Sequence, residues 1–439
     1  MSSQVSDTSV DNDTVSSDML VNNLVYRVGS ALSLVTERTG VRYFPQQQQI
    51  PSASLTTSTW DLNSGVSYAN LCNSYLAFDL SLVSSDSTST ANFGSGSAMN
   101  IIRSVILKSR SGTELCRADN ANVWSRNYHV NMLSAQYLRR EGLIEGWDVL
   151  EDGSASTTAR VYASQSATGN RRFVLPLARL APFFNSYKKG QKLPSAILSG
   201  MHMEIVFEDH RTAFLGLGTS TQYNGISNYN VSNLSIMIDC LTLTDDTQRA
   251  LNTEAAEGGL EIVSNQYYVS RMVSPSGETE LNMQIRKSVS QAESVSLVIL
   301  NTSNLLVINA DSFAGFAGDA TSHNWRLGSL YFPKTPITNT ETQQQENYFL
   351  TLQTYNKNDM LFEESGVSYT TYANGPYYSL NVCMEKDSGL NYSGLPCNNS
   401  RSIESLITFE NDDRARTCYA FLNYVSVIRT FIDNVSVAI

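Results

Sequence analysis

The chain has 439 residues, with 41 acidic and 30 basic residues and a formal net charge of −11. This balance argues against a nucleic-acid backbone as the main partner, because neutralising many phosphates requires clustered Lys and Arg. No stretch approaches the ~18 consecutive apolar residues of a membrane-spanning helix. The N-terminal residues lack the basic and apolar regions of a secretory signal, so we expect a chain made inside a cell, without a transmembrane segment.

Residues 1–50 are expected to form an acidic tail followed by an amphipathic arm. Residues 1–18 contain four Asp and no Lys or Arg, a composition that buries too little apolar surface to fold alone. Apolar residues then recur at helical spacing, which predicts a helix that Gly40 ends. Its apolar stripe consists of Leu20, Leu24, Val28, Leu32 and Val35. Such a helix either packs on its own domain or grips a neighbouring subunit or an inner layer of an assembly.

Alternation of apolar and polar residues predicts that β-strands dominate from residue 50 to the end. One half-buried strand carries Leu76, Phe78, Leu80 and Leu82. The same period of two recurs at 201–207, 234–238, 281–285, 348–352 and 435–439. Long polar stretches lie between strands, at 84–97, 151–170, 216–232, 311–345 and 363–401. Loops of that length in an all-β protein usually carry its surface function.

Two short helical segments are predicted among the strands. The first covers 177–187. The second lies near the middle of the chain, where Asp245 can cap the helix formers of 249–257 and Gly258-Gly259 ends them. We therefore divide the chain into a tail and arm (1–50), a first β half (51–245), a helical linker (246–259) and a second β half (260–439). No residue-level repeat relates the halves, so a duplication is expected only in the structure.

The sequence predicts no catalytic, cofactor or metal site. His202 and Glu204 share one face of a predicted strand, with His210 just beyond, but no spacing fixes a third metal ligand. The remaining histidines are His129 and His323. Hydrolase, metalloprotease and P-loop motifs do not occur. No CxxC pair is present, so we expect buried or idle thiols. The six cysteines are Cys72, Cys116, Cys240, Cys383, Cys397 and Cys418.

Short charged and glycine-containing spots also have ordinary structural interpretations. The acid pairs Glu363-Glu364 and Asp412-Asp413 could in principle serve a glycosidase, but neighbours along a strand point to opposite faces, and we interpret them as solvated turn residues. Lys188-Lys189 and Arg171-Arg172 are interpreted as surface or interface charge. Four loop glycines do not open a helix after a strand and are interpreted as turns. They are Gly216, Gly218, Gly315 and Gly318.

Aromatic residues make up 10% of the chain, and the long loops contain several tyrosines, as at 369–372 and 377–378. Protein interfaces are enriched in Tyr and Trp. Together with the small share of charged residues, this predicts a surface that other protein covers. A carbohydrate-binding face would use the same aromatic residues, so a lectin-like module stays open.

Three segments, in this order along the chain, carry a resemblance to a known family. The first comprises 73–78 (NSYLAF), 101–107 (IIRSVIL) and 112–115 (GTEL). The second runs from 172–177 (RFVLPL) through 183–184 and 193–194 to 200–205 (GMHMEI). The third runs from 419–424 (YAFLNY) through 428–429 to 435–437 (VSV). They resemble the double jelly-roll major capsid proteins of eukaryotic double-stranded DNA viruses, in particular those of polinton-like viruses, virophages and adintoviruses.

The resemblance covers about residues 50–439 and implies an all-β fold of two tandem jelly-roll β-sandwiches with short helices and an N-terminal arm helix. It implies a major capsid protein, not an enzyme and without cofactor, that assembles as a trimeric pseudo-hexagonal capsomer in an icosahedral virion. The implied partners are the chain itself, neighbouring capsomers, and penton and minor capsid or cement proteins, with no sequence-specific nucleic-acid binding. An acidic arm fits a genome pumped into a formed shell.

Two alternatives stay open beside the capsid function. A carbohydrate-binding or adhesive β-sandwich, such as a viral fibre or receptor-binding module, would use the aromatic loops to bind glycans. Its elongated form would show a shaft-like repeat, which the sequence lacks. An enzyme on a jelly-roll scaffold would need a convergent cluster, and the best candidates are His202, Glu204 and His210.

Overall fold

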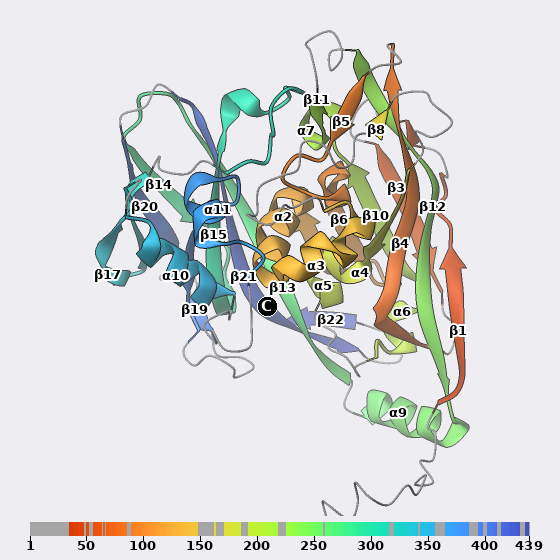
Figure 1. Cartoon of the computed structure of the whole chain (residues 1–439). Coiled ribbons are helices and arrows are strands. Elements are labelled where there is room, and N and C mark those ends of the chain that lie inside the picture. Colours follow the sequence, from red (N-terminus) through yellow and green to blue (C-terminus); the bar gives the residue numbers. More distant parts are fainter. Residues whose placement is uncertain are drawn as a thin grey trace, which may run out of the picture.

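The computed structural model contains two β-sandwiches that lie side by side, with short helices between them (Figure 1). The structure describes residues 35–438 except 48–49, 52–55, 64, 66, 86–88, 148–161, 164–170, 186–191, 218–224, 258–259, 316–319, 341–342, 356–364, 386–393, 398–401, 411–413 and 431–434.

The first sandwich consists of two four-stranded antiparallel layers. One has the order β1 (Val35–Tyr43), β12 (Ile226–Leu243), β4 (Tyr68–Ser84) and β9 (Arg171–Pro176), with β2 (Ile50–Pro51) also paired to β12. The other has the order β3 (Thr57–Leu62), β10 (Met201–Phe207), β6 (Ile102–Lys108) and β7 (Glu114–Asp119). A small additional sheet joins β11 (Leu215–Leu217), β5 (Thr90–Asn92) and β8 (Tyr162–Ala163).

The second sandwich is built in the same way. One layer has the order β13 (Leu260–Ser274), β21 (Arg416–Thr430), β15 (Val289–Asn301) and β18 (Leu380–Cys383). The other has the order β14 (Glu280–Ile285), β20 (Ile403–Phe409), β16 (Ala320–Leu327) and β17 (Leu330–Thr338). Two short strands extend the first layer, with β19 (Leu395–Cys397) on β15 and β22 (Val435–Ala438) on β21.

The two halves have the same strand topology. When the eight layer-forming strands of each half are counted along the chain, the layers read 1-8-3-6 and 2-7-4-5 in both. Eight antiparallel strands wound into two layers form a jelly roll. The predicted all-β fold of two tandem jelly rolls is therefore confirmed, and the duplication lies in the topology, since no repeat is visible in the sequence.

Helices occupy the connections between strands. The longest, α9 (Asp245–Glu257), follows β12 and precedes β13, and Figure 1 places it below the first sandwich. Helices α2 (Ala121–Met132) and α3 (Ala135–Arg139) lie between the sandwiches, close to α4 (Leu177–Leu180) and α5 (Pro182–Asn185) (Figure 1). The remaining helices are η1 (Ala98–Ile101), η2 (Glu141–Glu145), α6 (Ser195–Leu198), α7 (His210–Ala213), η3 (Thr302–Asn304), α10 (Gln345–Thr354) and α11 (Tyr369–Asn374).

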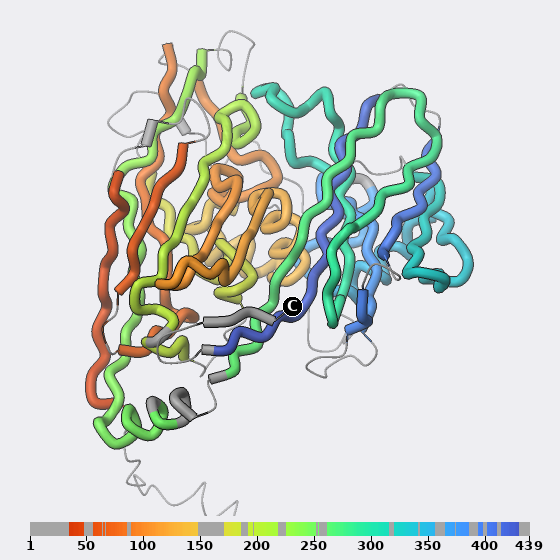
Figure 2. Tube along the Cα trace, turned by 180° about the vertical axis from the view of Figure 1, so that it is seen from behind, coloured from red at the N-terminus to blue at the C-terminus, as the bar shows by residue number. Residues whose placement is uncertain are grey.

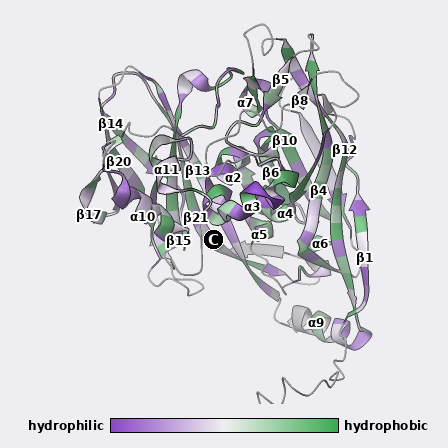
Figure 3. Ribbon diagram, in the orientation of Figure 1, coloured by the Kyte–Doolittle hydropathy of each residue, from purple (hydrophilic) through white to green (hydrophobic). Residues whose placement is uncertain are grey.

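Each sandwich encloses an apolar core, and the two cores meet at the boundary. Trp60 and Phe78 are fully buried in the first core, and Trp325 is buried in the second. The long strands β4 and β12 carry hydrophobic and hydrophilic residues in succession, as Figure 3 shows, because only one face of each strand meets its core. Tyr267 of β13 belongs to the first core, whereas Val130 of α2 belongs to the second, so side chains cross the boundary in both directions.

The prediction that the arm helix includes Val35 and ends at Gly40 is wrong. Val35 and Gly40 lie in β1, where Gly40 pairs with Asp239 of β12. A Cβ atom on Gly40 would lie 2.6 Å from the Met237 methyl carbon, so this glycine lies within a paired strand, against a flexible side chain, and does not end a helix. The first sandwich consequently begins before residue 50. The other stripe residues of the predicted helix, and the tail 1–18, lie outside the described residues.

The strand predicted at 348–352 is also wrong, since these residues lie in α10. The buried side of this helix is polar, with Asn347 and Thr351 buried at a spacing of four, whereas Phe349 is 54% exposed. The alternating apolar residues therefore do not mark the buried face. The stretch 311–345 was predicted as a loop but contains β16 and β17. The prediction failed because β16 buries polar residues such as His323 and Asn324, so no apolar alternation marks the strand.

Candidate functional site

The best candidate ligands from the sequence form a cross-strand charge cluster. His202 of β10 places Nδ1 2.7 Å from an Asp61 carboxylate oxygen on β3, and its Nε2 lies 3.4 Å from Glu204. Lys108 of β6 donates a 2.7 Å hydrogen bond to Glu204. This hydrogen bond is the main cause that lowers the pKa of Glu204. Opposite charges on neighbouring strands stabilise a sheet face, and this is the role that the contacts support.

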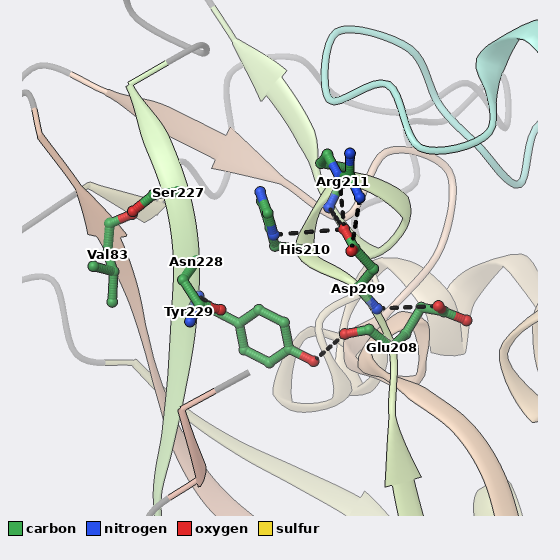
Figure 4. A network of polar contacts seen from close by, with 8 residues as sticks. All are labelled: Val83, Glu208, Asp209, His210, Arg211, Ser227, Asn228 and Tyr229. Atoms are coloured by element: carbon green, nitrogen blue, oxygen red, sulfur yellow. Dashed lines mark hydrogen bonds and ion pairs between the residues drawn. The ribbon is translucent and has the colours of Figure 1, made fainter. Parts of the chain in front are cut away.

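His210 does not join this cluster, because it begins α7 beyond the far end of β10. Its Nδ1 lies 3.5 Å from Asp209, which also accepts hydrogen bonds from the backbone and side chain of Arg211 (Figure 4). Burial lowers the pKa of His210. Tyr229 of β12 donates its hydroxyl to the Glu208 carbonyl oxygen at 2.7 Å. The network holds α7 against β12.

His129 and His323 are buried in separate places. The His129 ring meets Trp124 edge-on, and burial holds its pKa well below the ordinary value. Burial lowers the pKa of His323 to about 4. In the part of the chain that the structure describes, no three His, Cys, Asp or Glu residues gather into a group that could hold a metal ion.

The other spots noted in the sequence have local roles or lie outside the described residues. Arg172 of β9 lies 3.4 Å from Asp79 of β4. The Gly216 amide donates a hydrogen bond to the Ile308 carbonyl oxygen at 2.5 Å, and the Gly315 amide donates one to the Pro376 carbonyl oxygen at 2.6 Å. Outside the described residues lie Glu363-Glu364, Asp412-Asp413, Lys188-Lys189, Gly218 and Gly318.

No disulfide joins any two of the six cysteines, all of which lie in the described part of the chain. Four of them are buried, and Cys72 is exposed. Burial raises the pKa of Cys116 to about 12, so this thiol stays protonated at neutral pH. Among the described helices, none is long and apolar enough to cross a membrane.

The most elaborate arrangement of side chains is the seam between the sandwiches, which α2 occupies. The Trp124 ring stacks on Tyr267 of β13, with 4.9 Å between ring centres. Asn127 donates a 2.8 Å hydrogen bond to the Tyr355 hydroxyl of the second half. Sequence periodicity did not predict α2, because nearly all its residues are buried and no polar stripe marks it.

Arg126 of α2 is the central charged residue of the seam. Its side chain is buried, and it donates hydrogen bonds to the Ser95 hydroxyl and to the carbonyl oxygens of Phe313 and Pro376. Its guanidinium lies 4.8 Å from the centre of the Tyr377 ring. One side chain thus joins a helix of the first half to two loops of the second.

Asp311 completes this junction from the second half. Its carboxylate accepts hydrogen bonds from the Ser95 amide at 2.9 Å and the Ser95 hydroxyl at 2.5 Å. Tyr377 donates its hydroxyl to the Ser95 carbonyl oxygen at 2.9 Å. Gly94 has a φ of 57°, and a Cβ there would lie 2.8 Å from the Asp311 carboxyl carbon. The positive φ and the nearby carboxyl group both favour glycine at this contact between the halves.

Large apolar side chains are exposed at several places outside the seam. Leu330 and Tyr331 lie on the edge strand β17, and Phe349 lies on α10. Leu306 is 51% exposed and has a φ of 61°, a conformation that is rare for a bulky residue and costs on the order of 1 kcal/mol. Exposed apolar residues indicate a contact surface only when they form one patch, and Leu330 and Tyr331, as consecutive residues of β17, point to opposite faces of the strand.

Comparison with known proteins gives agreement in fold but not in sequence. No family model matches the chain, and no curated protein matches it. The Faustovirus major capsid protein matches with a TM-score of 0.63 at 8% identity, covering 94% of each chain. PBCV-1 VP54, fitted into a reconstruction of the virophage Sputnik, matches with a TM-score of 0.60 at 12% identity, covering 94% of this chain and 98% of that chain.

A 3.5 Å structure of the Sputnik virophage matches with a TM-score of 0.55 at 11% identity, covering 94% of this chain and 91% of that chain. The fold is a double jelly roll. The double jelly roll spans nearly the whole chain, as the resemblance in the sequence implied. The three segments that carried the resemblance lie mainly on its strands, among them β4, β6, β9, β10 and β21.

Proposed function

We propose that the chain is the major capsid protein of an icosahedral double-stranded DNA virus and assembles as a trimeric capsomer. The observation that carries this proposal is the repeated jelly-roll topology, matched over 94% of the chain by viral capsid proteins. Three chains with two jelly rolls each place six similar units in a ring, and such a ring has a nearly hexagonal outline that tiles a shell.

The seam supports this proposal physically. A capsomer made of paired jelly rolls keeps its outline only when the two rolls of each chain keep a fixed orientation. Arg126, Asp311 and the Trp124–Tyr267 stack join the halves by polar and aromatic contacts in one place. These buried contacts resist sliding, because any shift leaves buried polar groups unpaired.

The division of the chain belongs to the same proposal. We assign the first jelly roll from Val35 to about residue 245, the helix α9 as the connection, and the second jelly roll from residue 260 onward. In the virion, the expected partners are further copies of the chain and the penton and minor capsid or cement proteins. A structural role without catalysis agrees with the neighbours, which are capsid components.

Electron microscopy and mass measurement of the purified chain test the proposal. We expect particles with a hexagonal outline and a mass of three chains, or a hexagonal lattice of them. A monodisperse monomer that binds glycans would contradict the capsomer and favour an adhesive module. Retention on DNA or heparin at ~0.15 M salt would contradict a genome-independent shell, because a net acidic chain should not bind them under such screening.

A further inference from the structure

Several elements of one jelly roll have a counterpart in the other, because the two halves share one strand topology. β7 and β17 are the fifth layer-forming strands of their halves in chain order. The helices α2 and α10 both follow the fifth strand and precede the sixth. β1 and β13 are the first strands. The surroundings of corresponding elements can therefore be compared pair by pair.

Within the chain, β7 and α2 of the first half pack against β13, the first strand of the second half. Gln266 of β13 donates a hydrogen bond to the Leu115 carbonyl oxygen of β7 at 2.9 Å. The Tyr267 hydroxyl donates one to the Asp119 carbonyl oxygen, also at 2.9 Å. Trp124 of α2 stacks on the same Tyr267 ring. The seam is thus a contact of a fifth strand and its following helix with the first strand of the next jelly roll.

The counterparts of β7 and α2 in the second half are much more exposed. All nine residues of β17 are described, and of these only Ile337 is buried, whereas β7 buries three of its six residues. The helix α10 buries Asn347 and Thr351, whereas nearly every residue of α2 is buried. The second half therefore presents, without cover, the surface that the first half buries in the seam.

β1, the counterpart of β13, is exposed as well. None of its nine residues is buried, whereas Tyr267 of β13 is buried in the seam. Figure 1 places β1 on the outer flank of the first sandwich and β17 at the far side of the second, and Figure 2 shows the same arrangement from behind. A single chain cannot bring these two surfaces together, because both sandwiches lie between them. Adjacent copies can.

The exposed side chains of the two surfaces are complementary. At the end of β1, alternation places Arg42 and Phe44 on one face, and both are exposed, whereas Tyr43 between them is half-buried. On α10, Glu346 and Phe349 lie about one helical turn apart, and both are exposed. Each surface thus presents one charged and one aromatic side chain, and the two charges are opposite.

We propose that β17 and α10 of one copy pack against β1 of the next copy, with Glu346 facing Arg42 and Phe349 lying against Phe44. This inference rests on the proposed trimer, because it repeats between copies the contact that the seam makes within one copy. The two surfaces differ, so the contact is head-to-tail, and such a contact closes into a ring when the rotation between copies allows it.

The aromatic and the charged residues have different roles in this contact. Phe44 and Phe349 supply most of the affinity, since a few large aromatic side chains carry most of the binding free energy of an interface. Arg42 and Glu346 fix the register, because opposite charges across an interface favour one arrangement over others. All four side chains are exposed in the single chain, so they can be changed without disturbing its cores.

Charge reversal in the full-length chain tests the contact. Arg42→Glu and Glu346→Arg, each alone, should raise the dissociation constant of the trimer at least ~tenfold, because each change places like charges opposite one another. The double variant inverts the pair and should restore binding. As a control, Arg42→Glu is combined with Glu280→Arg, at an exposed residue of β14, and this combination should not restore it. Analytical ultracentrifugation measures the dissociation constant.

Photocrosslinking identifies the segment that covers α10. Phe349 is replaced by p-benzoylphenylalanine, and Val273, which is 49% exposed on β13 and thus lies at the seam, serves as the control position. Isotopically labelled and unlabelled chains are mixed before assembly. We expect crosslinks from position 349 to peptides containing Phe44 that join labelled to unlabelled chains, at least ~tenfold above the control, as a specific contact requires.

The mass of the wild-type particle lets the two proposals fail separately. A trimer that both single charge reversals leave unchanged, or that the double variant does not rescue, would overturn the contact and leave the capsomer intact. Crosslinks from position 349 that stay within one chain, or that reach another segment of the neighbouring copy, would overturn it as well. A wild-type monomer would overturn both proposals.

Discussion

The guanidinium of Arg126 lies 4.8 Å from the centre of the Tyr377 ring, and this pair joins the two jelly rolls. The helix that carries Arg126 precedes Tyr377 by about 250 residues of sequence, so the pair exists only in the folded chain. Burial lowers the pKa of Arg126, and three neighbouring residues accept its hydrogen bonds. Burying the Arg126 charge therefore costs desolvation free energy, and the hydrogen bonds that offset this cost form only in one arrangement of the two halves.

Arg126→Met should destabilise the chain by about 3 kcal/mol or more, because it leaves buried acceptors on Ser95, Phe313 and Pro376 unpaired. Urea unfolding of the purified chain measures the change. Arg172→Met is the matched control, since Arg172 is about half exposed in its pair with Asp79, and it should cost less than about 0.5 kcal/mol. Equal losses for both variants would contradict a special role of the seam.

Gly94→Ala should destabilise the chain more than Gly65→Ala. Both glycines have positive φ, at 57° and 62°, so both variants incur backbone strain of about 1 kcal/mol. Only at Gly94 would the new Cβ meet the Asp311 carboxyl group, whereas nothing lies within 4 Å of it at Gly65. Thermal unfolding should show a further loss of about 1–2 kcal/mol for Gly94→Ala. Similar losses of unfolding free energy in the two variants would mean that Asp311 moves away from the new Cβ atom at little cost, and would contradict the prediction.

His323 should make the chain sensitive to acid. Its pKa is lowered to about 4 by burial, whereas the unfolded chain has the ordinary value near 6.5. The unfolded state therefore binds the proton more tightly, and stability should fall by up to about 3 kcal/mol as the pH drops from 6.5 to 4. His323→Gln should lose this part of the pH dependence. An unchanged pH profile in the variant would exclude His323 as its source.

Glu293 should act in the opposite direction. Burial, together with Glu385, raises the pKa of Glu293 to about 7, so the folded state binds the proton more tightly than the unfolded one. Stability from this group is present below about pH 4.5 and is lost as the pH rises through 7. Glu293→Gln should therefore stabilise the chain at pH 8, on the order of 2 kcal/mol. The exposed Glu280→Gln should change little, and a destabilised Glu293→Gln variant would contradict the prediction.

Leu306→Gly should separate chain stability from assembly. Glycine adopts the φ of 61° at Leu306 without strain, so the unfolding free energy of the chain should not fall despite the higher flexibility of glycine. If the exposed Leu306 side chain lies in a contact between subunits, the proposed trimer of the variant should dissociate at a higher protein concentration than that of the wild type. Analytical ultracentrifugation measures this, and unchanged dissociation would exclude Leu306 from the interface.

The sequence by itself determined the all-β class, most of the long strands and the order of two similar halves. Period-two alternation at 201–207 or 281–285 is visible because one face of each strand meets an apolar core. The same reasoning was wrong for 348–352, since α10 buries Asn347 and Thr351 and exposes Phe349. It also placed Val35 in a helix that Gly40 ends, because local spacing does not reveal β12, with which both residues pair.

Only the tertiary structure decided the seam. Arg126, Ser95, Asp311 and Tyr377 belong to four separate parts of the chain, and none carries a local signal of its contacts. Helix α2 is buried on nearly all sides, so it has no amphipathic stripe. Local periodicity reports which face of an element is buried, whereas hydrogen bonds between distant residues depend on how complete sheets pack. That is why periodicity predicted two β halves, and the family resemblance implied two jelly rolls, but neither predicted the contacts that join them.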